Sequence, residues 1–200
     1  MASPIPLPFS KPLDGISGNT LAIHHDKLYA GYVAKKDEIA TKLDALMRGD
    51  LSSANATYSE LRGLKDSETF ATNGVYLHET YFDVLGGDGV PTGQLADALA
   101  TTYGSVDAFI AVMSACAMAS RGWTVLAWDT HDATFRIVNG DAHNHGGVWG
   151  CLPLIVLDVY EHAYFIDHGS DRKAYVAAFW KNLDWSKVDT RYQKAVGRES

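Results

Sequence analysis

Hydrophobic positions in the first part of the chain recur with the spacing of α-helices. In residues 19–48 they keep to one helical face until Gly49 ends the pattern, and they are Leu21, His24, Leu28, Tyr32, Ile39, Leu43, Leu46 and Met47. Residues 67–85 form a second helical stretch, with Asp66 or Ser67 as its N-cap and a glycine pair as its stop. The front of the chain is therefore predicted to be a pair of long helices.

A glycine-rich segment, residues 86–93, separates this front from the rest of the chain. Its four glycines and one proline in eight residues break any regular element. We therefore expect two domains, a helical hairpin at residues 1–87 and an α/β domain at residues 88–200. Beyond the segment, residues 93–103 and 105–119 again show helical spacing.

The period of the pattern then changes from helix to strand. Residues 123–129 and 134–139 are short, rich in aromatic and β-branched residues and separated by a turn, which predicts an antiparallel hairpin. The apolar run 152–157 is expected as a third strand in the centre of the sheet, and residues 171–182 return to helical spacing. The predicted fold class is α+β, with a long N-terminal helical hairpin and C-terminal helices packed on a small three-stranded antiparallel sheet.

Composition excludes several classes of protein. The 200 residues are 46% hydrophobic and 11% aromatic, which is enough to bury a core and argues against disorder. The formal net charge is −7, and the basic residues are scattered along the chain. Nucleic acid is therefore not expected as a partner, because phosphate binding needs a concentrated basic face.

The two cysteines and the N-terminus bear on the compartment. Cys116 and Cys151 stand in apolar contexts far apart, which favours buried free thiols over a disulfide and suits a reducing compartment. The N-terminus lacks a charged region followed by an apolar one, and no stretch reaches membrane-spanning length. We expect a soluble cytoplasmic protein that does not bind a membrane.

The residues with most chemical potential are an acid and three histidines. Asp158 and His162 stand four residues apart directly after the apolar run, and His24 and His78 lie within apolar helical stretches. Each histidine alone is more often a hydrogen-bonded core residue than a ligand. Together, however, three imidazole nitrogens and one carboxylate oxygen make a ligand set for Fe, Mn or Zn that leaves a further position free.

This ligand set favours redox chemistry on a small anion. One carboxylate leaves residual positive charge on the ion, and the chain has no HExxH motif for zinc hydrolysis. Tyr32, eight residues after His24, could line the same helical face, or be a core tyrosine. His143 could donate to solvent bound at the metal, or be a loop histidine. Glu161 could accept from His162 of a second subunit, or be an ordinary surface acid.

Five blocks of the chain resemble the iron/manganese superoxide dismutases, in the same order and over nearly the whole length. DVYEHAYF resembles the family's DVWEHAYY, and HHDKLYAGYV resembles its HHxKHHxxYV. NGVYLHETYF falls where the second ligand histidine is expected. SRGWTVLAWD resembles GSGWxxLxWD, and DRKAYVAAFWKNLDW resembles RxxYxxxFWxxxNW.

The resemblance implies a role for particular residues. The metal ligands would be His24, His78, Asp158 and His162, with the metal site between the two domains. Tyr32 would stand at the substrate gateway, and Tyr164 would reach toward that channel from the partner subunit. His143 would donate to the solvent on the metal, which agrees with the small Gly74 four residues before His78.

The resemblance also implies the reaction and the partners. One Fe or Mn ion per subunit would cycle between two oxidation states, converting two superoxide ions and two protons into O2 and H2O2. Lys27 and Arg172 match basic positions of the family and would attract the anion to a negatively charged protein. Glu161 and Tyr164 favour a homodimer, or a homotetramer built from it.

Several positions depart from the family pattern. Leu28 and Tyr29 replace the usual histidine pair, Tyr160 replaces a tryptophan, Arg121 replaces a serine, and Val125 replaces a common aromatic residue. These departures keep a non-catalytic metal-binding relative open as an alternative. A metal-dependent peroxidase or oxygenase is a further alternative, which would need one of the three histidines to stay uncoordinated.

Overall fold

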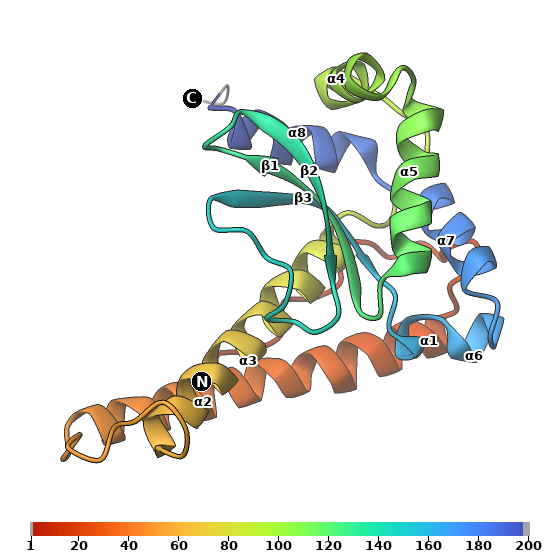
Figure 1. Ribbon diagram of the computed structural model, residues 1–200. Helices are drawn as coiled ribbons and strands as arrows, with labels where there is room; N and C mark the ends of the chain where they lie inside the picture. Colours follow the sequence, from red (N-terminus) through yellow and green to blue (C-terminus); the bar gives the residue numbers. More distant parts are fainter. Residues whose placement is uncertain (1, 198–200) are drawn as a thin grey trace.

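The computed structural model describes residues 2–197. Two long antiparallel helices extend from a body in which further helices surround a three-stranded sheet (Figure 1). The elements in chain order are α1 (Gly18–Ile23), a π-helical segment (His24–Tyr29), α2 (Ala30–Met47), α3 (Glu60–Asp83), α4 (Gly93–Tyr103), α5 (Val106–Ala119), β1 (Trp123–Asp129), β2 (Thr134–Gly140), β3 (Cys151–Asp158), a 3-10 helix (Glu161–Ala163), α6 (Phe165–His168), α7 (Arg172–Lys181) and α8 (Trp185–Ala195). The predicted α+β fold class is confirmed.

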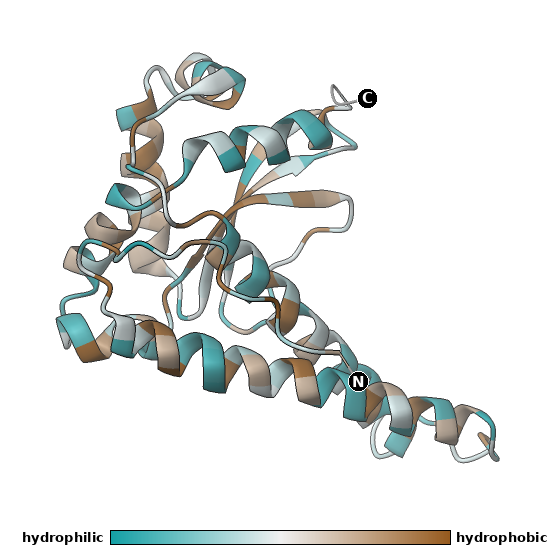
Figure 2. Ribbon diagram, turned by 180° about the vertical axis from the view of Figure 1, so that it is seen from behind, coloured by the Kyte–Doolittle hydropathy of each residue, from teal (hydrophilic) through white to brown (hydrophobic). Residues whose placement is uncertain are grey.

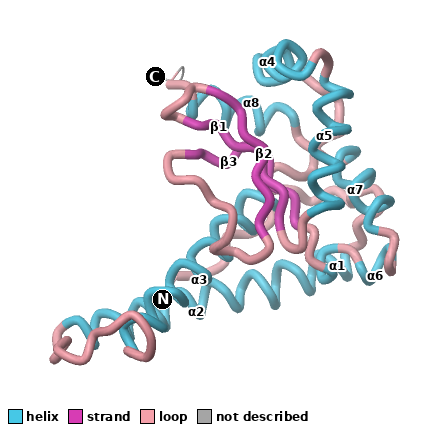
Figure 3. Tube along the Cα trace, in the orientation of Figure 1, coloured by secondary structure: helices cyan, strands magenta, loops and turns pink. Residues whose placement is uncertain are grey.

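The N-terminal hairpin consists of α1, the π-helical segment and α2 running into one another, with α3 packed antiparallel to α2. The loop that joins α2 to α3 lies at the far end of the hairpin from the sheet (Figure 3). The prediction that the second helix starts at residue 67 is wrong, because α3 begins at Glu60 with Ser59 as its N-cap. Leu61 and Leu64 in the additional turns pack against a small apolar cluster of Ile39, Leu43 and Ala71. This packing favours the longer helix.

The sheet has the order β2-β1-β3, with both pairs antiparallel. The prediction that residues 152–157 form the central strand is wrong, because β1 is central and β3 lies at an edge. Pro153 has no N–H to donate to a second neighbour, so β3 is suited to an edge position. Residues 154–157 are nonetheless buried, because β3 packs against α3 and α8. The apolar run therefore reflects cover by helices, and the strands in Figure 2 carry brown stretches beside white and teal ones.

The C-terminal part surrounds the sheet with helices, of which α8 was not anticipated. Trp185, Val188 and Tyr192 of α8 are buried, and the Asp184 side chain caps its first turn. Among residues 2–197, no single helix is long and apolar enough to cross a membrane, and α4 with α5 meets that measure only as a pair bent by 80°. The domain boundary at residue 87 stays a prediction.

The cysteines are free, as predicted, and lie on different elements. Cys116 belongs to α5 and Cys151 begins β3. Both thiol-bearing residues are partly exposed, so the expectation that they are buried is wrong. Each lies at a position that faces partly outward, on the surface of α5 and at the open start of an edge strand.

A test of the connection between hairpin and body is available at Gly87. A Cβ added there would lie 2.2 Å from the Leu183 carbonyl oxygen and 2.4 Å from the Asp184 Cα, both backbone atoms. Gly87→Ala is expected to lower the free energy of unfolding by about 1–3 kcal/mol, because the two segments must separate. Urea unfolding of the purified protein measures this.

The matched control is Gly63→Ala in α3, where an added Cβ meets nothing within 4 Å. This change is expected to raise the free energy of unfolding by about 0.5–1 kcal/mol, as for a helical glycine replaced by alanine. Equal effects of the two substitutions would contradict the close packing at Gly87.

Candidate metal centre

Four predicted ligands meet at one point of the fold, although they come from four different elements. His24 begins the π-helical segment, His78 lies in α3, Asp158 ends β3 and His162 lies in the 3-10 helix. One ligand atom from each residue lies within 4.8 Å of the others. His24, His78 and Asp158 are fully buried, whereas His162 is partly exposed. The cluster has the composition predicted from the sequence.

The Asp158 carboxylate is the centre of this cluster. Its Oδ2 lies 3.0 Å from His24 Nε2, 3.1 Å from His162 Nε2 and 3.6 Å from His78 Nε2. Its other oxygen, Oδ1, accepts a hydrogen bond of 2.9 Å from the Tyr160 backbone N–H. The backbone thus orients the carboxylate. Oδ2 then faces the Nε2 atom of each of the three imidazole rings.

His78 shows that this arrangement fits a metal ion. Its Nδ1 donates to the Gly74 carbonyl at 2.5 Å, so the proton is on Nδ1 and the lone pair is on Nε2. That buried Nε2 has no hydrogen-bond partner among the described residues. An unpaired buried lone pair facing two other imidazoles and a carboxylate is a costly arrangement unless a cation is bound. The donor set suits Fe, Mn or Zn, as its chemistry predicted.

The protonation states of His24, His78 and Asp158 agree with ligand chemistry. Burial lowers the pKa of His24, and burial lowers that of His78 to about 3, so both rings are neutral near pH 7. Burial alone would raise the pKa of Asp158, but the charges and hydrogen bonds of His162 and His24 outweigh it and hold the carboxyl ionised. The Asp158 charge raises the pKa of His162 despite its burial. Asp158 therefore offers an anionic oxygen and His24 and His78 offer neutral ring nitrogens, whereas a metal ion at His162 would displace a proton that Asp158 favours.

The local sequence explains how the elements bring these groups together. In the sheet Asp158 is paired with Trp123, at the end where β1 begins and β3 ends. The Tyr175 hydroxyl lies 2.7 Å from the Asp158 carbonyl oxygen and 3.1 Å from the Tyr81 hydroxyl, which ties α7 and α3 to this strand end. A π-helical segment is a common distortion at functional sites, and here it carries His24.

His143 lies beside the cluster with a defined tautomer. Its Nδ1 accepts a hydrogen bond of 2.9 Å from Trp123 Nε1, which can only donate. A neutral His143 therefore carries its proton on Nε2, and burial lowers its pKa to about 4. The prediction of a hydrogen-bond donor is thus compatible with the geometry, and the residue is buried, not a surface loop histidine.

Tyr32 packs against His143 next to a glycine. The two rings meet edge to face with centroids 4.6 Å apart, and Tyr32 lies 5.4 Å from the His78 ring centroid. A Cβ on Gly74 would come within 3.0 Å of Tyr32 Cδ1 and 3.4 Å of His143 Cδ2. The small residue at position 74 therefore makes room for both rings. Burial and the Asp158 charge raise the pKa of Tyr32, so its hydroxyl keeps its proton.

The interface prediction for Tyr164 needs correction. Tyr164 is 4% exposed and stacks on Tyr175 within its own chain, so its ring is not free to reach outward. Its neighbour Phe165 is 55% exposed and presents its ring to the outside. Glu161 is exposed on the 3-10 helix, where a second subunit could meet it.

The two predicted basic residues differ in their surroundings. Lys27 is exposed on the π-helical segment. The Arg172 guanidinium is partly buried and donates to the Ser120 carbonyl at 2.7 Å and to the Tyr164 hydroxyl at 3.3 Å. Among residues 2–197 the guanidinium donates to neutral oxygens, which leave its positive charge uncompensated.

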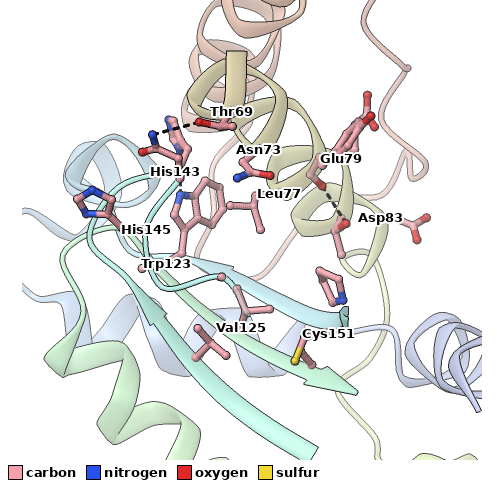
Figure 4. A pocket seen from close by; sticks show the side chains of 18 of the residues that line it. Thr69, Asn73, Leu77, Glu79, Asp83, Trp123, Val125, His143, His145 and Cys151 are labelled. Carbon is pink, nitrogen blue, oxygen red and sulfur yellow. Dashed lines mark hydrogen bonds between the residues drawn. The ribbon is translucent and has the colours of Figure 1, made fainter. Parts of the chain in front are cut away.

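A groove of about 960 Å³ runs between α3 and the sheet, and Trp123 and His143 are among the residues that line it. Figure 4 shows these two side chains at one end of it, with Val125 on the sheet and Asn73 and Leu77 on α3. None of the four clustered ligands lines the groove. The small Val125 widens it, which gives the departure at this position a structural consequence.

Trp123 and Tyr175 were assigned no role from the sequence. Trp123 sets the His143 tautomer and Tyr175 holds the Asp158 backbone. Both residues belong to blocks that carry the family resemblance, SRGWTVLAWD and DRKAYVAAFWKNLDW. Their polar atoms could have indicated these roles, because a buried indole N–H or phenol hydroxyl needs a hydrogen-bond partner.

Comparison with known proteins agrees with this geometry. Residues 91–191 match the family model described as iron/manganese superoxide dismutases, C-terminal domain. The chain is 44% identical to the Fe superoxide dismutase of Aquifex pyrophilus over 92% of this chain and 87% of that protein. It is 34% identical to Mn superoxide dismutase 1 of Halobacterium salinarum, over 98% and 96% of the two chains. With three histidine nitrogens facing one carboxylate at its centre, the chain belongs to the iron/manganese superoxide dismutase family.

Proposed function

We propose that this protein is a superoxide dismutase, which converts two superoxide ions and two protons into O2 and H2O2. The observation that carries the proposal is the convergence of His24, His78 and His162 on the Asp158 carboxylate. Relatives named as Fe and as Mn superoxide dismutases cover most of the chain, which supports one Fe or Mn ion in each subunit. A bound Fe or Mn ion would supply the one-electron oxidation and reduction of superoxide.

The chain's own residues hold the ion and manage protons. The three imidazoles and Asp158 would hold it, with His78 oriented by its hydrogen bond to Gly74. His143 presents an Nε2–H because Trp123 occupies its Nδ1, so it can donate to an oxygen at the site. Tyr32 keeps its hydroxyl proton and lies against His143, where it can donate to the same region.

The positive charge that attracts superoxide is proposed to come from Arg172 and Lys27. The protein as a whole repels an anion, since its formal net charge is −7. Arg172 donates to carbonyl and hydroxyl oxygens, which leaves its charge available to steer the substrate. Lys27 is exposed on the π-helical segment, three residues after His24.

A homodimer is proposed from the surface beside His162. The His162 side chain is 26% exposed in the single chain, and next to it Phe165 and Ile166 are exposed apolar residues. A second copy on this surface would cover them and bring its Glu161 toward His162. A homotetramer would need a further interface. A cytoplasmic location is proposed from the two free thiols.

The proposed function is tested by loading the purified protein separately with Fe and with Mn and measuring dismutation. Activity above that of the same concentration of free ion is expected with at least one metal. His78→Ala is expected to lower metal affinity by more than about 100-fold, since loss of a group that only orients a ligand already costs about 10–100-fold. Metal content after dialysis, measured with activity, records both losses.

The control is His145→Ala, which changes an exposed loop histidine and leaves the four ligands intact. It should keep native metal content and activity. A metal-replete native protein that dismutes superoxide no faster than free metal would instead favour the non-catalytic relative.

The role of His143 gives a separate prediction. His143→Ala is expected to lower kcat by about 10–100-fold while metal content stays near one ion per subunit, because the residue donates beside the ion and is not a ligand. Trp123→Phe removes the Nε1–H that sets the His143 tautomer, and a smaller loss of kcat is expected. Loss of metal in His143→Ala would contradict this assignment.

The proposed dimer surface can be tested by charge. Phe165→Asp is expected to convert a dimer into a monomer, because an uncompensated carboxylate would be buried in the interface. Sedimentation at several concentrations measures the mass. The control is Val112→Asp, an exposed apolar position of α5 that should leave the dimer intact. A native protein that sediments as a monomer, or a Phe165→Asp dimer, would overturn this surface.

A further inference from the structure

Tyr160 occupies a position between a ligand and the loop that carries His143. Its ring stacks on His162 with an interplanar angle of 16° and centroids 5.3 Å apart. The same ring meets His143 edge to face at 5.5 Å and Trp123 at 6.1 Å. One aromatic side chain therefore touches the ligand, the donor and the residue that sets the donor's tautomer.

The Tyr160 hydroxyl has a specific acceptor. It donates to the Asp141 carbonyl oxygen at 3.3 Å, two residues before His143. Asp141 is held from a second direction, because its Oδ1 accepts from the Arg121 backbone N–H at 3.2 Å. The loop after β2 is thus fastened to the start of β1 by Arg121 and to the metal centre by Tyr160.

The approach of this hydroxyl depends on Gly122. A Cβ added to Gly122 would lie 2.7 Å from Tyr160 Cζ and 2.9 Å from its hydroxyl oxygen. The ring tip thus fills the volume that a side chain at residue 122 would need. Any side chain there would move the hydroxyl away from Asp141, so the contact rests on two residues of the sequence, Tyr160 and Gly122.

We propose that Tyr160 is a positioning residue for His143, through the hydrogen bond from its hydroxyl to the Asp141 carbonyl. Two contacts then fix the donor: Trp123 Nε1 holds the His143 ring, and Tyr160 holds the backbone that carries it. A shift of the loop would change the direction of the His143 Nε2–H, and small misplacements of a catalytic group lower the rate. This inference rests on the proposed function.

A purely apolar wall beside the ion is the competing role for Tyr160. Such a wall needs the ring and its stacking on His162, but not the hydroxyl. Tyr160→Phe keeps the ring and removes the hydroxyl, so it separates the two roles. Gly122→Ala is an independent second variant, because it keeps the hydroxyl and displaces it from Asp141.

The experiment is a double-mutant cycle on the metal-loaded protein, with kcat expressed per bound ion. Tyr160→Phe should lower kcat by about 2–10-fold, the range that the loss of one hydrogen bond of about 0.5–1.5 kcal/mol gives. In a His143→Ala background the same change should cost less than about twofold, because the residue being positioned is gone. Gly122→Ala should show the same dependence on His143.

The second readout is the electron paramagnetic resonance spectrum of the bound ion. Tyr160→Phe should shift it in the direction of His143→Ala, and the double variant should match His143→Ala alone. Tyr103→Phe, which removes the hydroxyl of a tyrosine on α4 away from the centre, is the control and should change neither readout.

Equal fold losses in both backgrounds, or an unchanged kcat and spectrum in Tyr160→Phe, would overturn the positioning role. Failure of the proposed function is distinguishable, because it is the absence of dismutation by the native metal-loaded protein. In that case the spectrum still reports whether Tyr160 and His143 act on the ion together.

Discussion

The fold depends on one buried carboxylate, that of Asp158, held among three imidazoles. A fully buried carboxylate costs several kcal/mol unless charges and hydrogen bonds compensate it. Here the Tyr160 backbone N–H satisfies Oδ1, while Oδ2 faces the ring nitrogens of His24, His78 and His162. These residues belong to the π-helical segment, α3, the end of β3 and the following 3-10 helix, so a cation at this point would join the hairpin to the C-terminal part of the chain. Metal binding and the docking of hairpin onto sheet therefore stabilise each other.

The space beside the four clustered residues is organised by the small residue at position 74. The Gly74 carbonyl orients His78, and the missing side chain leaves room for Tyr32 and His143. A larger residue there would compete with His143 for the same volume. Trp123 holds the side chain of His143, in the loop after β2, through the hydrogen bond from its Nε1–H. The pairing of Gly74 on α3 with His143 in the loop was already visible in the sequence. The structure shows that this pairing is a packing requirement.

Much of this could be predicted from the sequence, and the failures have physical causes. The four clustered residues were singled out because histidines and an acid in apolar stretches stand out, and the motif blocks pointed to the same four positions. The π-helical segment was missed because it is short and lies between α-helices, so the hydrophobic pattern around it still fits a period of 3.6 residues. The edge position of β3 was missed because burial by helices makes an edge strand apolar, although Pro153 was a signal against a central strand. Tyr164 was placed at the interface because its motif says nothing of which way a ring turns.

The departures from the family pattern differ in how close they come to the chemistry. Tyr29 is buried, accepts from the Ile5 backbone N–H at 3.0 Å and donates to Glu79 at 2.9 Å. His25 also lies 2.8 Å from the Ile5 carbonyl oxygen. The departure at Tyr29 therefore fastens the N-terminal arm to α3. Tyr160, in contrast, contacts His162 and the loop that carries His143. A substitution absorbed by the arm changes what supports the site, whereas one between His162 and His143 changes the immediate surroundings of the clustered residues.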